Sequence, residues 1–263
     1  MNTALITGAS SGIGMELATI HASRGGDLVL VARSKERLDK MKADLEQQFK
    51  IRVHVIAADL SRPGAAKEVH DQTSAMGITV DILVNNAGFG VFGAFQETDP
   101  ERTGEMIRLN ITALTELTWF YLREMVSRNS GRIMNVASTA GFQPGPWFAA
   151  YSATKAYVIS FTQAIESELR STTATTAIRV ITYCPAATET NFSAAAAMEH
   201  SALFKGRKNP DAATVALDAY EALMKGESLA IHGLMNRIMV FSQRFVPRSF
   251  VTAMANSEIR ARN

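Results

Sequence analysis

Short apolar runs alternate with helical patterns along almost the whole chain, and this alternation limits the fold more than any other feature. Apolar runs occur at residues 3–7, 27–32, 52–57, 82–84, 132–137, 178–183 and 228–232, with helical periodicity between most of them. Strands that alternate with helices form βαβ units with parallel strands. We therefore expect an α/β fold with one doubly wound, Rossmann-type parallel sheet and helices on both faces. The pattern predicts one domain at 1–232, followed by an extension at 233–263.

A glycine-rich segment lies between the first expected strand and the first expected helix. It reads Gly8-Ala9-Ser10-Ser11-Gly12-Ile13-Gly14. Glycines let a backbone approach a pyrophosphate closely, and the free N–H groups at a helix N-terminus favour an anion. The spacing is G-x-x-x-G-x-G, whereas the common dinucleotide fingerprint is G-x-G-x-x-G. A dinucleotide site is the favoured interpretation, and a tight turn without ligand is the alternative.

Arg33 ends the second expected strand, nineteen positions after Gly14. NAD-binding folds usually carry an acid about 20 residues past the glycines, where it holds the ribose 2′-hydroxyl. No Asp or Glu occurs from Leu28 to Lys35. The planar guanidinium of arginine can pair with a 2′-phosphate, so the sequence favours NADP over NAD. A solvated arginine at a helix start is the alternative.

Polar and small residues follow the next strands. Asp59 comes just past the third strand, where it could bind an adenine amino group or cap the next helix. Asn86, Ala87 and Gly88 follow the fourth strand, and these small residues allow close approach to a flat ligand. Asn110 lies among apolar neighbours within one long helical pattern at 99–128. It is either structural or holds a water or a carbonyl for chemistry.

Ser138, Tyr151 and Lys155 form the most informative constellation. Ser138 ends a strand and should point into the crevice where ligands of such sheets bind. Tyr151 and Lys155 are four residues apart, so they share one face of a helix. An ammonium about 4–5 Å from a phenol lowers the pKa of that phenol by roughly two to three units, if desolvation is ignored. The spacing therefore predicts an acid/base tyrosine.

The ordered set TGASSGIG, NNAG, Asn110, Ser138 and YSATK resembles the short-chain dehydrogenases/reductases, over residues 3–232. The resemblance implies an oxidoreductase that transfers a hydride between NADP(H) and an apolar carbonyl or secondary alcohol. The rival hypothesis is a non-catalytic NADP(H)-binding regulatory or scaffold protein on the same fold. A lyase or epimerase variant would usually need further acid/base groups, and no motif places any.

The resemblance also implies roles for individual residues. Tyr151 is the general acid/base, and Lys155 lowers its pKa and bonds the nicotinamide ribose. Ser138 polarises the substrate oxygen, and Asn110 holds a water that connects Lys155 to solvent. The implied cofactor-binding residues are Gly8, Ser10, Ser11, Gly12, Ile13, Gly14, Arg33, Asp59, Leu60, Asn86, Ala87, Gly88, Tyr151, Lys155, Pro185, Thr188 and Thr190.

Two segments depart from the family pattern. The family's Pro-Gly after the sixth strand reads Pro185-Ala186, so a positive φ at that glycine would force Ala186 to strain or reshape the loop. Residues 171–177 make a loop about four residues longer than usual, with little expected effect on chemistry.

Substrate choice should lie in loops with few charges, so we expect a small apolar carbonyl or alcohol substrate. Some of these side chains could instead pack at a hinge or a subunit contact. They are Phe142, Pro144, Pro146, Trp147, Phe148, Phe192, Met198, Phe204 and the alanines at 194–197.

Composition and charge exclude several other classes. Hydrophobic residues make up 47% and the net charge is +2, without a basic run, so no nucleic-acid partner is expected. The five histidines lack metal-ligand spacing, and no metal site is expected. No leader peptide and no apolar run of about 18 residues is visible. The single Cys184 indicates a cytoplasmic protein and should be a small buried residue rather than a reactive thiol.

The segment 233–263 has apolar residues at helical spacing, interrupted by Arg237, Arg244 and Arg248 and broken at Pro247. Packing on its own domain or on a partner subunit is the favoured interpretation. A cover over the substrate site and contact with a membrane surface are the alternatives, and neither is favoured. The resemblance implies a homodimer or homotetramer built on the long helices around Asn110 and Tyr151. The sequence leaves open dimer or tetramer, substrate identity and reaction direction.

Overall fold

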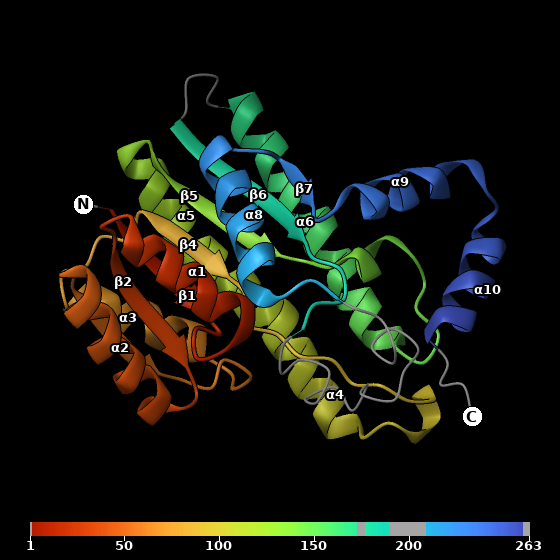
Figure 1. Cartoon of the computed structure of the whole chain (residues 1–263), viewed down its shortest axis with the longest axis horizontal. Coiled ribbons are helices and arrows are strands. Elements are labelled where there is room, and N and C mark those ends of the chain that lie inside the picture. Colours follow the sequence, from red (N-terminus) through yellow and green to blue (C-terminus); the bar gives the residue numbers. More distant parts are fainter. Residues whose placement is uncertain (1, 173–176, 190–208, 260–263) are drawn as a thin grey trace.

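The computed structural model describes residues 2–172, 177–189 and 209–259. This part of the chain forms one parallel sheet of seven strands in the order β3-β2-β1-β4-β5-β6-β7 (Figure 1). The strands are β1 (Thr3–Thr7), β2 (Asp27–Ala32), β3 (Val53–Ala57), β4 (Ile82–Asn85), β5 (Ser130–Val136), β6 (Ala177–Cys184) and β7 (Leu229–Ile231). The order reverses between β1 and β4, and ligands of open α/β sheets bind at such a switch point. The expected fold class is confirmed.

Helices cover both faces of the sheet. On one face, α1, α2 and α8 bury an apolar cluster that includes Leu17, Leu38 and Val215. On the other face, α3 and α5 bury a second cluster that includes Val69 and Leu117, and the half-buried Ile165 of α6 packs against it. The bounds are α1 (Gly12–Ser23), α2 (Lys35–Phe49), α3 (Ala65–Ala75), α5 (Leu114–Arg128), α6 (Ala149–Thr172) and α8 (Ala212–Lys225). Because both faces are covered, the central strands are apolar without alternation.

The helix expected at 99–128 is interrupted, which corrects the sequence interpretation. The chain forms α4 (Pro100–Ile107), then a π-helical turn, η2 (Arg108–Ala113), and then α5. One wide turn leaves the apolar spacing nearly unchanged, so periodicity did not reveal it. Asn110 sits in this π turn and is only 1% exposed. Such turns are frequent at functional sites.

The C-terminal segment leaves the sheet edge directly. Gly233 joins β7 to α9 (Leu234–Ser242), and η4 (Gln243–Phe245) and α10 (Arg248–Ile259) follow. The helical run is interrupted at Pro247, as expected, and α9 and α10 both extend beyond the end of the sheet (Figure 1). The domain boundary at residue 232 stays a prediction. Within the described ranges, no helix has the length and apolar character needed to cross a membrane.

Candidate active site

A cavity of about 800 Å³ follows the carboxyl ends of the strands. Sixteen residues expected in the site line it, from seven different segments of the chain. They are Gly8, Ser10, Ser11, Gly12, Ile13, Arg33, Asp59, Leu60, Asn86, Ala87, Gly88, Ser138, Tyr151, Lys155, Pro185 and Thr188. Gly14 and Asn110 do not line the cavity, but both contact residues that do. Thr190 lies outside the described residues, as do the expected substrate residues Phe192, Met198 and Phe204.

The glycine-rich turn needs its glycines for two different reasons. Gly8 has φ +67° and Gly12 has φ +56°, in the left-handed region that favours glycine. A Cβ on Gly14 would lie only 2.5 Å from the Gly8 carbonyl oxygen and 2.5 Å from Asn86 Nδ2. Gly14 therefore lets α1 approach the turn closely. The Ser11 side chain does not cap α1, so the helix N-terminus offers its N–H groups to an anion.

The fourth strand and the glycine turn are locked together by Thr7. Its Oγ1 accepts hydrogen bonds from the backbone N–H groups of Asn86 at 3.0 Å and Ala87 at 2.9 Å. The Asn86 side chain donates to the Thr7 carbonyl oxygen at 2.9 Å. These bonds fix the floor of the cavity where small residues leave room for a flat ligand.

Two arginines stand where β2 ends. Arg33 and Arg37 are both exposed and both line the cavity. Ser34 caps α2 by accepting a hydrogen bond from the Arg37 backbone N–H at 3.4 Å. The sequence analysis missed Arg37, although it lies one helical turn after Arg33. Two guanidinium groups at this place fit a cofactor phosphate on the ribose.

Asp59 closes a turn and does not cap a helix, which corrects one of its two expected roles. Its Oδ1 accepts from Ser61 N at 3.0 Å and Ser61 Oγ at 2.7 Å, whereas Gly64 is the N-cap of α3. Burial acts to raise the pKa of Asp59, but the bonds from Ser61 and the charges of Arg33 and Arg62 lower it overall. The carboxylate is therefore ionised beside the cavity, and its contact with an adenine stays a prediction.

The three expected catalytic side chains meet at one wall of the cavity. Tyr151 and Lys155 come from α6, and Ser138 follows β5 and begins η3 (Thr139–Phe142). All three are buried, with exposed fractions of 6%, 5% and 9%. Lys155 Nζ donates to the Val136 carbonyl oxygen at 2.8 Å and lies 5.7 Å from the centre of the Tyr151 ring. The structure thus brings the three predicted side chains together, and their catalytic roles stay predictions.

The electrostatics of this wall differ from the expectation. Burial raises the pKa of Tyr151 above the ordinary phenol value, and a hydrogen bond with Ser138 opposes the shift. Burial also lowers the pKa of Lys155 to about 8. The expected lowering of the tyrosine pKa by lysine is therefore absent in this structure. The reason is that both groups are desolvated together, which shifts each equilibrium toward the neutral form, although a lysine with a pKa of about 8 is still mostly charged at pH 7. A neutral phenol is suited to donate a proton.

Asn110 holds the wall in place from behind. Its Oδ1 accepts from Phe89 N at 3.3 Å, and its Nδ2 donates to Phe89 O at 3.0 Å and to Thr154 Oγ1 at 3.1 Å. Thr154 Oγ1 in turn donates to the Tyr151 carbonyl oxygen at 2.7 Å. Asn110 thus joins the loop after β4 to the catalytic helix. These bonds favour the structural interpretation, and the water it was expected to hold stays a prediction.

The part of the cavity beside Tyr151 is mostly apolar. The Phe148 ring stacks on the Tyr151 ring with centres 4.2 Å apart, and Phe89 and Met106 complete the buried cluster. Other wall residues that the sequence analysis missed are Arg102, Leu109, Gln143, Met235, Asn236 and Met239. They come from the adjacent α4 and η2, from the end of η3 and from α9, three regions that are distant from one another in the sequence. Among the residues expected before Tyr151, Phe148 lines the cavity, whereas Phe142 packs in a separate cluster.

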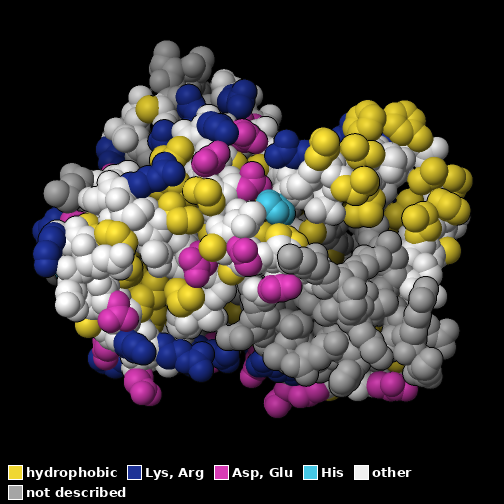
Figure 2. All heavy atoms as spheres, in the orientation of Figure 1, with side chains coloured by type: hydrophobic (Ala, Val, Ile, Leu, Met, Phe, Trp, Pro, Cys, Tyr) yellow, Lys and Arg dark blue, Asp and Glu magenta, His cyan; other side chains and the backbone are white. Residues whose placement is uncertain are grey.

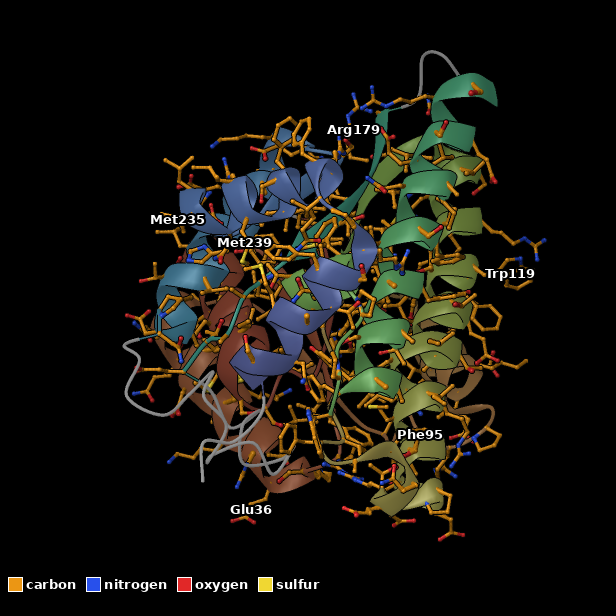
Figure 3. The ribbon with its side chains drawn as sticks, turned by 90° about the vertical axis from the view of Figure 1, so that its right-hand side faces the viewer. Glu36, Phe95, Trp119, Arg179, Met235 and Met239 are labelled. Carbon is orange, nitrogen blue, oxygen red and sulfur yellow. The ribbon has the colours of Figure 1, made fainter. Side chains whose placement is uncertain are left out.

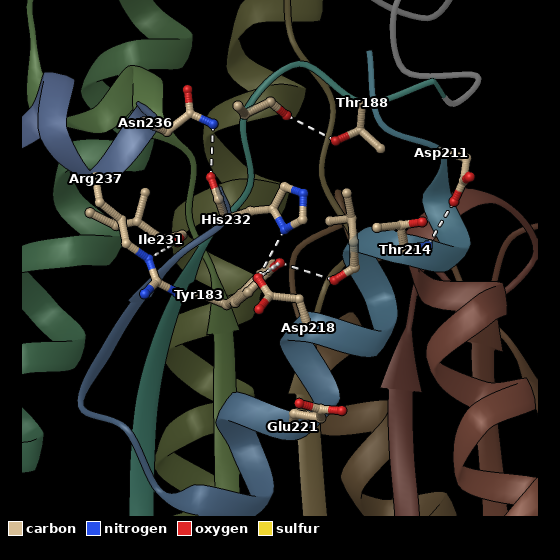
Figure 4. Close-up of polar contacts among 12 residues, drawn as sticks. Tyr183, Thr188, Asp211, Thr214, Asp218, Glu221, Ile231, His232, Asn236 and Arg237 are labelled. Carbon is tan, nitrogen blue, oxygen red and sulfur yellow. Dashed lines mark hydrogen bonds and ion pairs between the residues drawn. The ribbon is translucent and has the colours of Figure 1, made fainter. Parts of the chain in front are cut away.

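A polar network anchors α9 to the sheet (Figure 4). Asp218 Oδ2 accepts a hydrogen bond from the Tyr183 hydroxyl at 3.0 Å and pairs with His232 Nδ1 at 2.9 Å. Asn236 Nδ2 donates to the His232 carbonyl oxygen at 2.7 Å, and Arg237 Nε donates to Ile231 O at 2.8 Å. The network fixes the first turn of α9 and with it the part of the cavity wall that Met235 and Met239 form.

Two expectations about the sixth strand have clear outcomes. Ala186 does not have a positive φ, so the backbone strain considered for this position does not occur. Thr188 Oγ1 donates to Ala186 O at 2.9 Å, which stabilises the loop instead. Cys184 is buried, and burial raises the pKa of its thiol to about 12, as suits a packed, unreactive side chain. The described residues hold no cluster of His, Cys, Asp and Glu fit for a metal.

Known proteins share this fold and sequence pattern. The short chain dehydrogenase family profile matches residues 2–200. A short-chain dehydrogenase from Sphingobium yanoikuyae, solved in complex with NADPH, is 32% identical with a TM-score of 0.82 and covers 99% of this chain and 97% of its own. The bulky-bulky ketone specific alcohol dehydrogenase from Comamonas testosteroni is 31% identical with a TM-score of 0.78, over 99% of this chain and 95% of its own.

Curated relatives match a shorter stretch. Human very-long-chain 3-oxoacyl-CoA reductase is 34% identical over 174 residues, which are 64% of this chain and 54% of the relative. The chain thus matches about half the length of the curated relatives that it resembles.

Proposed function

Since the chain belongs to the short-chain dehydrogenase family, we propose that it is an oxidoreductase that transfers a hydride between NADP(H) and an apolar carbonyl or secondary alcohol. One observation carries the proposal. Tyr151, Ser138 and Lys155 line the same cavity as the glycine turn and the two arginines, Arg33 and Arg37. The acid/base groups therefore lie in the same cavity as the residues that could bind a dinucleotide.

The residues present fit NADP. A Cβ at Gly8 or at Gly14 would lie within 2.8 Å of Asn86 Nδ2, so the turn needs glycine there, and the start of α1 offers N–H groups to the pyrophosphate. Arg33 and Arg37 would hold the 2′-phosphate. When bound, the cofactor supplies or accepts the hydride.

The protein itself supplies the proton for the carbonyl oxygen and stabilises the negative charge that develops there. In reduction, Tyr151 gives its hydroxyl proton to the carbonyl oxygen as negative charge builds there. Ser138 donates a hydrogen bond to the same oxygen and stabilises the charge. A buried phenol with a raised pKa is protonated at neutral pH, which matches a donor. Lys155 remains a proposed partner of the cofactor ribose, and in oxidation its charge would favour the phenolate.

The lining and the named relatives support a bulky apolar substrate rather than a small one. Phe89, Phe148 and Leu109 line the cavity and belong to the apolar cluster around Tyr151. The Comamonas relative is named for bulky ketones and the human relative for a very-long-chain 3-oxoacyl thioester. The first name describes a ketone with two bulky groups and the second a 3-oxo group on a very long acyl chain.

The test is turnover of NADPH with a matched panel of ketones. We would compare a diaryl ketone, a long-chain 3-oxoacyl thioester and acetone, following the absorbance of the reduced nicotinamide. We expect a kcat/KM for the bulky ketones at least about a hundredfold above that for acetone. Tight NADPH binding without turnover of any ketone would instead support the non-catalytic, cofactor-binding hypothesis.

The remaining expectations stay proposals. A homodimer or homotetramer built on α5 and α6 fits their outer faces, where Trp119 and Tyr157 are exposed. Trp119 stands out from that flank (Figure 3). The cytoplasmic location indicated by the single cysteine rests on the sequence alone.

A further inference from the structure

The outer sides of α9 and α10 carry the densest exposed apolar surface of the described chain. Six side chains define what we call the α9–α10 face: Leu234, Ile238, Phe241, Phe245, Phe250 and Met254, with exposed fractions of 72%, 53%, 56%, 74%, 54% and 48%. Their side chains gather at one end of the molecule (Figure 2). Leu234, Ile238 and Phe241 on α9 and Phe245 on η4 recur at intervals of four, three and four residues, so they form one stripe. Patches of this kind mark interaction sites.

The inner sides of the same helices already make the contacts that hold them to the domain. On α10, Val251 and Ala255 are buried, and Asn256 Oδ1 accepts a hydrogen bond from Trp147 Nε1 at 2.8 Å. In η4, Gln243 Nε2 donates to Gln143 Oε1 at 2.8 Å. Packing on the domain, which the sequence favoured, therefore explains the inner side alone.

The charge of the segment points to an anionic surface. From Leu234 to Asn263 the sequence has five arginines and one glutamate, an excess of four positive side chains in a chain whose net charge is +2. Arg237, Arg244 and Arg248 are exposed beside the α9–α10 face. The guanidinium of Arg244 lies 5.5 Å from the centre of the Phe241 ring. An apolar stripe bordered by arginines is typical of helices that lie in the interface of an anionic membrane.

A second copy of the chain fits this face less well. Subunits related by a two-fold axis present the same patch to each other. The arginines of one α9–α10 face would then meet the arginines of the other, with no carboxylate between Leu234 and Ser257 to balance them. Lipid phosphates supply the missing negative charge.

We propose that the α9–α10 face docks the protein on membranes that contain anionic lipids. Met239, on the inner side of α9, lines the cavity, and Met235 and Met239 can be followed along the helix in Figure 3. One helix would therefore have lipid on its outer side and the substrate cavity on its inner side. An apolar substrate dissolved in the bilayer would reach the cavity by a short path. The docking itself does not depend on the proposed enzymatic activity.

The experiment is flotation of the full chain with vesicles. One set contains phosphatidylcholine mixed with phosphatidylglycerol, and the other contains phosphatidylcholine alone. We expect binding to the anionic vesicles that is at least about tenfold stronger than to the neutral ones and that weakens as salt is raised. The double variant Phe241→Ser/Phe245→Ser and the double variant Arg244→Gln/Arg248→Gln should each lose most of it. The control Met76→Ser/Leu217→Ser removes two exposed apolar side chains elsewhere, which are 47% and 45% exposed, and should bind like the unaltered chain.

Three results would overturn the proposal. They are no binding to the anionic vesicles, equal binding to both vesicle types, and equal binding of the chain and the Phe241→Ser/Phe245→Ser variant. Light scattering provides a separate check without lipid. If the unaltered chain is an oligomer that this variant splits into monomers, the α9–α10 face joins two copies of the chain and the membrane assignment is wrong.

Discussion

The amino nitrogen of Lys155 lies 5.7 Å from the centre of the Tyr151 ring, one helical turn away on α6. It donates its hydrogen bond to the Val136 carbonyl oxygen at 2.8 Å, at the end of β5. The lysine is thus anchored to the sheet while it lies beside the tyrosine. Because both side chains are buried, their charged forms are disfavoured together.

Replacing Tyr151 by phenylalanine tests the proton donor. We expect Tyr151→Phe to lower kcat for ketone reduction by about 10²–10⁴-fold, because the transition state loses its proton source. The ring would still stack on Phe148, so folding and NADPH binding should persist. Kinetics together with NADPH fluorescence titration measure both effects. A loss smaller than about tenfold would remove Tyr151 from the proposed role.

Replacing Lys155 by methionine should stabilise the fold while it impairs turnover. The pKa of Lys155 is lowered to about 8 in the folded chain, below the ordinary value of 10.5, so folding at pH 7 carries the cost of burying a charge. We expect Lys155→Met to raise the free energy of unfolding at pH 7 by about 1–3 kcal/mol. Urea denaturation measures it, with the exposed Lys40→Met as control.

The same shift fixes the sign of a pH effect. Between pH 8 and 10.5 the unfolded chain binds the Lys155 proton more tightly than the folded chain, so this group makes stability rise with pH. The increase in the free energy of unfolding caused by Lys155→Met should therefore become smaller as pH rises from 8 to 10.5. A gain that grows with pH would contradict the assignment.

Four tyrosines should limit stability at higher pH. Burial raises the pKa of Tyr121, Tyr151, Tyr183 and Tyr220 above the model-compound value of 10.0. Below pH 10 these tyrosines are neutral in both the folded and the unfolded chain, so burying them costs no charge. As pH rises through 10, the unfolded chain loses their protons first, and the folded chain becomes less stable relative to it. We expect the free energy of unfolding to fall above pH 10, by up to about 1.4 kcal/mol per pH unit for each tyrosine. Phenolate absorbance should then appear together with the loss of circular dichroism, and phenolate in a still folded chain would refute this.

The substitution Gly14→Ala tests the close contact behind the glycine turn. The new Cβ would lie 2.5 Å from the Gly8 carbonyl oxygen, so the turn or α1 must shift. We expect a loss of about 1–3 kcal/mol in the free energy of unfolding and weaker NADPH binding. Gly104→Ala is the control, because its nearest neighbour is the movable end of the Arg108 side chain at 3.3 Å. Equal effects at the two glycines would show that packing at Gly14 is not special.

Cofactor preference tests the two arginines after β2. We expect Arg33→Asp/Arg37→Ala to lower kcat/KM with NADPH at least about tenfold relative to NADH, because the 2′-phosphate loses both guanidinium partners. Lys35→Ala lies between them on the chain, does not line the cavity and should leave the ratio unchanged. An unaltered preference in the double variant would show that the phosphate binds elsewhere.

The fold and most of the site followed from local sequence. Strand-forming runs and helical periodicity predicted the parallel sheet, because apolar spacing reflects which side of each element is buried. The ends of parallel strands meet at one edge, so Gly8, Arg33, Asn86 and Ser138 could be assigned to one site before their distances were known. Tyr151 and Lys155 followed from the helical repeat alone.

Other features depended on contacts between distant segments. The wall residues Arg102 and Met239 share the cavity with segments far from them along the chain. Asn110 bonds Phe89 and Thr154, which are 21 and 44 positions away, and Asp218 on α8 anchors His232 after β7. The raised pKa of Tyr151 is of the same kind, because desolvation depends on everything packed around a group and spacing reports a single neighbour. The sequence by itself thus determined which groups could react. The tertiary structure decided their burial and charge, the walls of the cavity, and which side of α9 remains exposed.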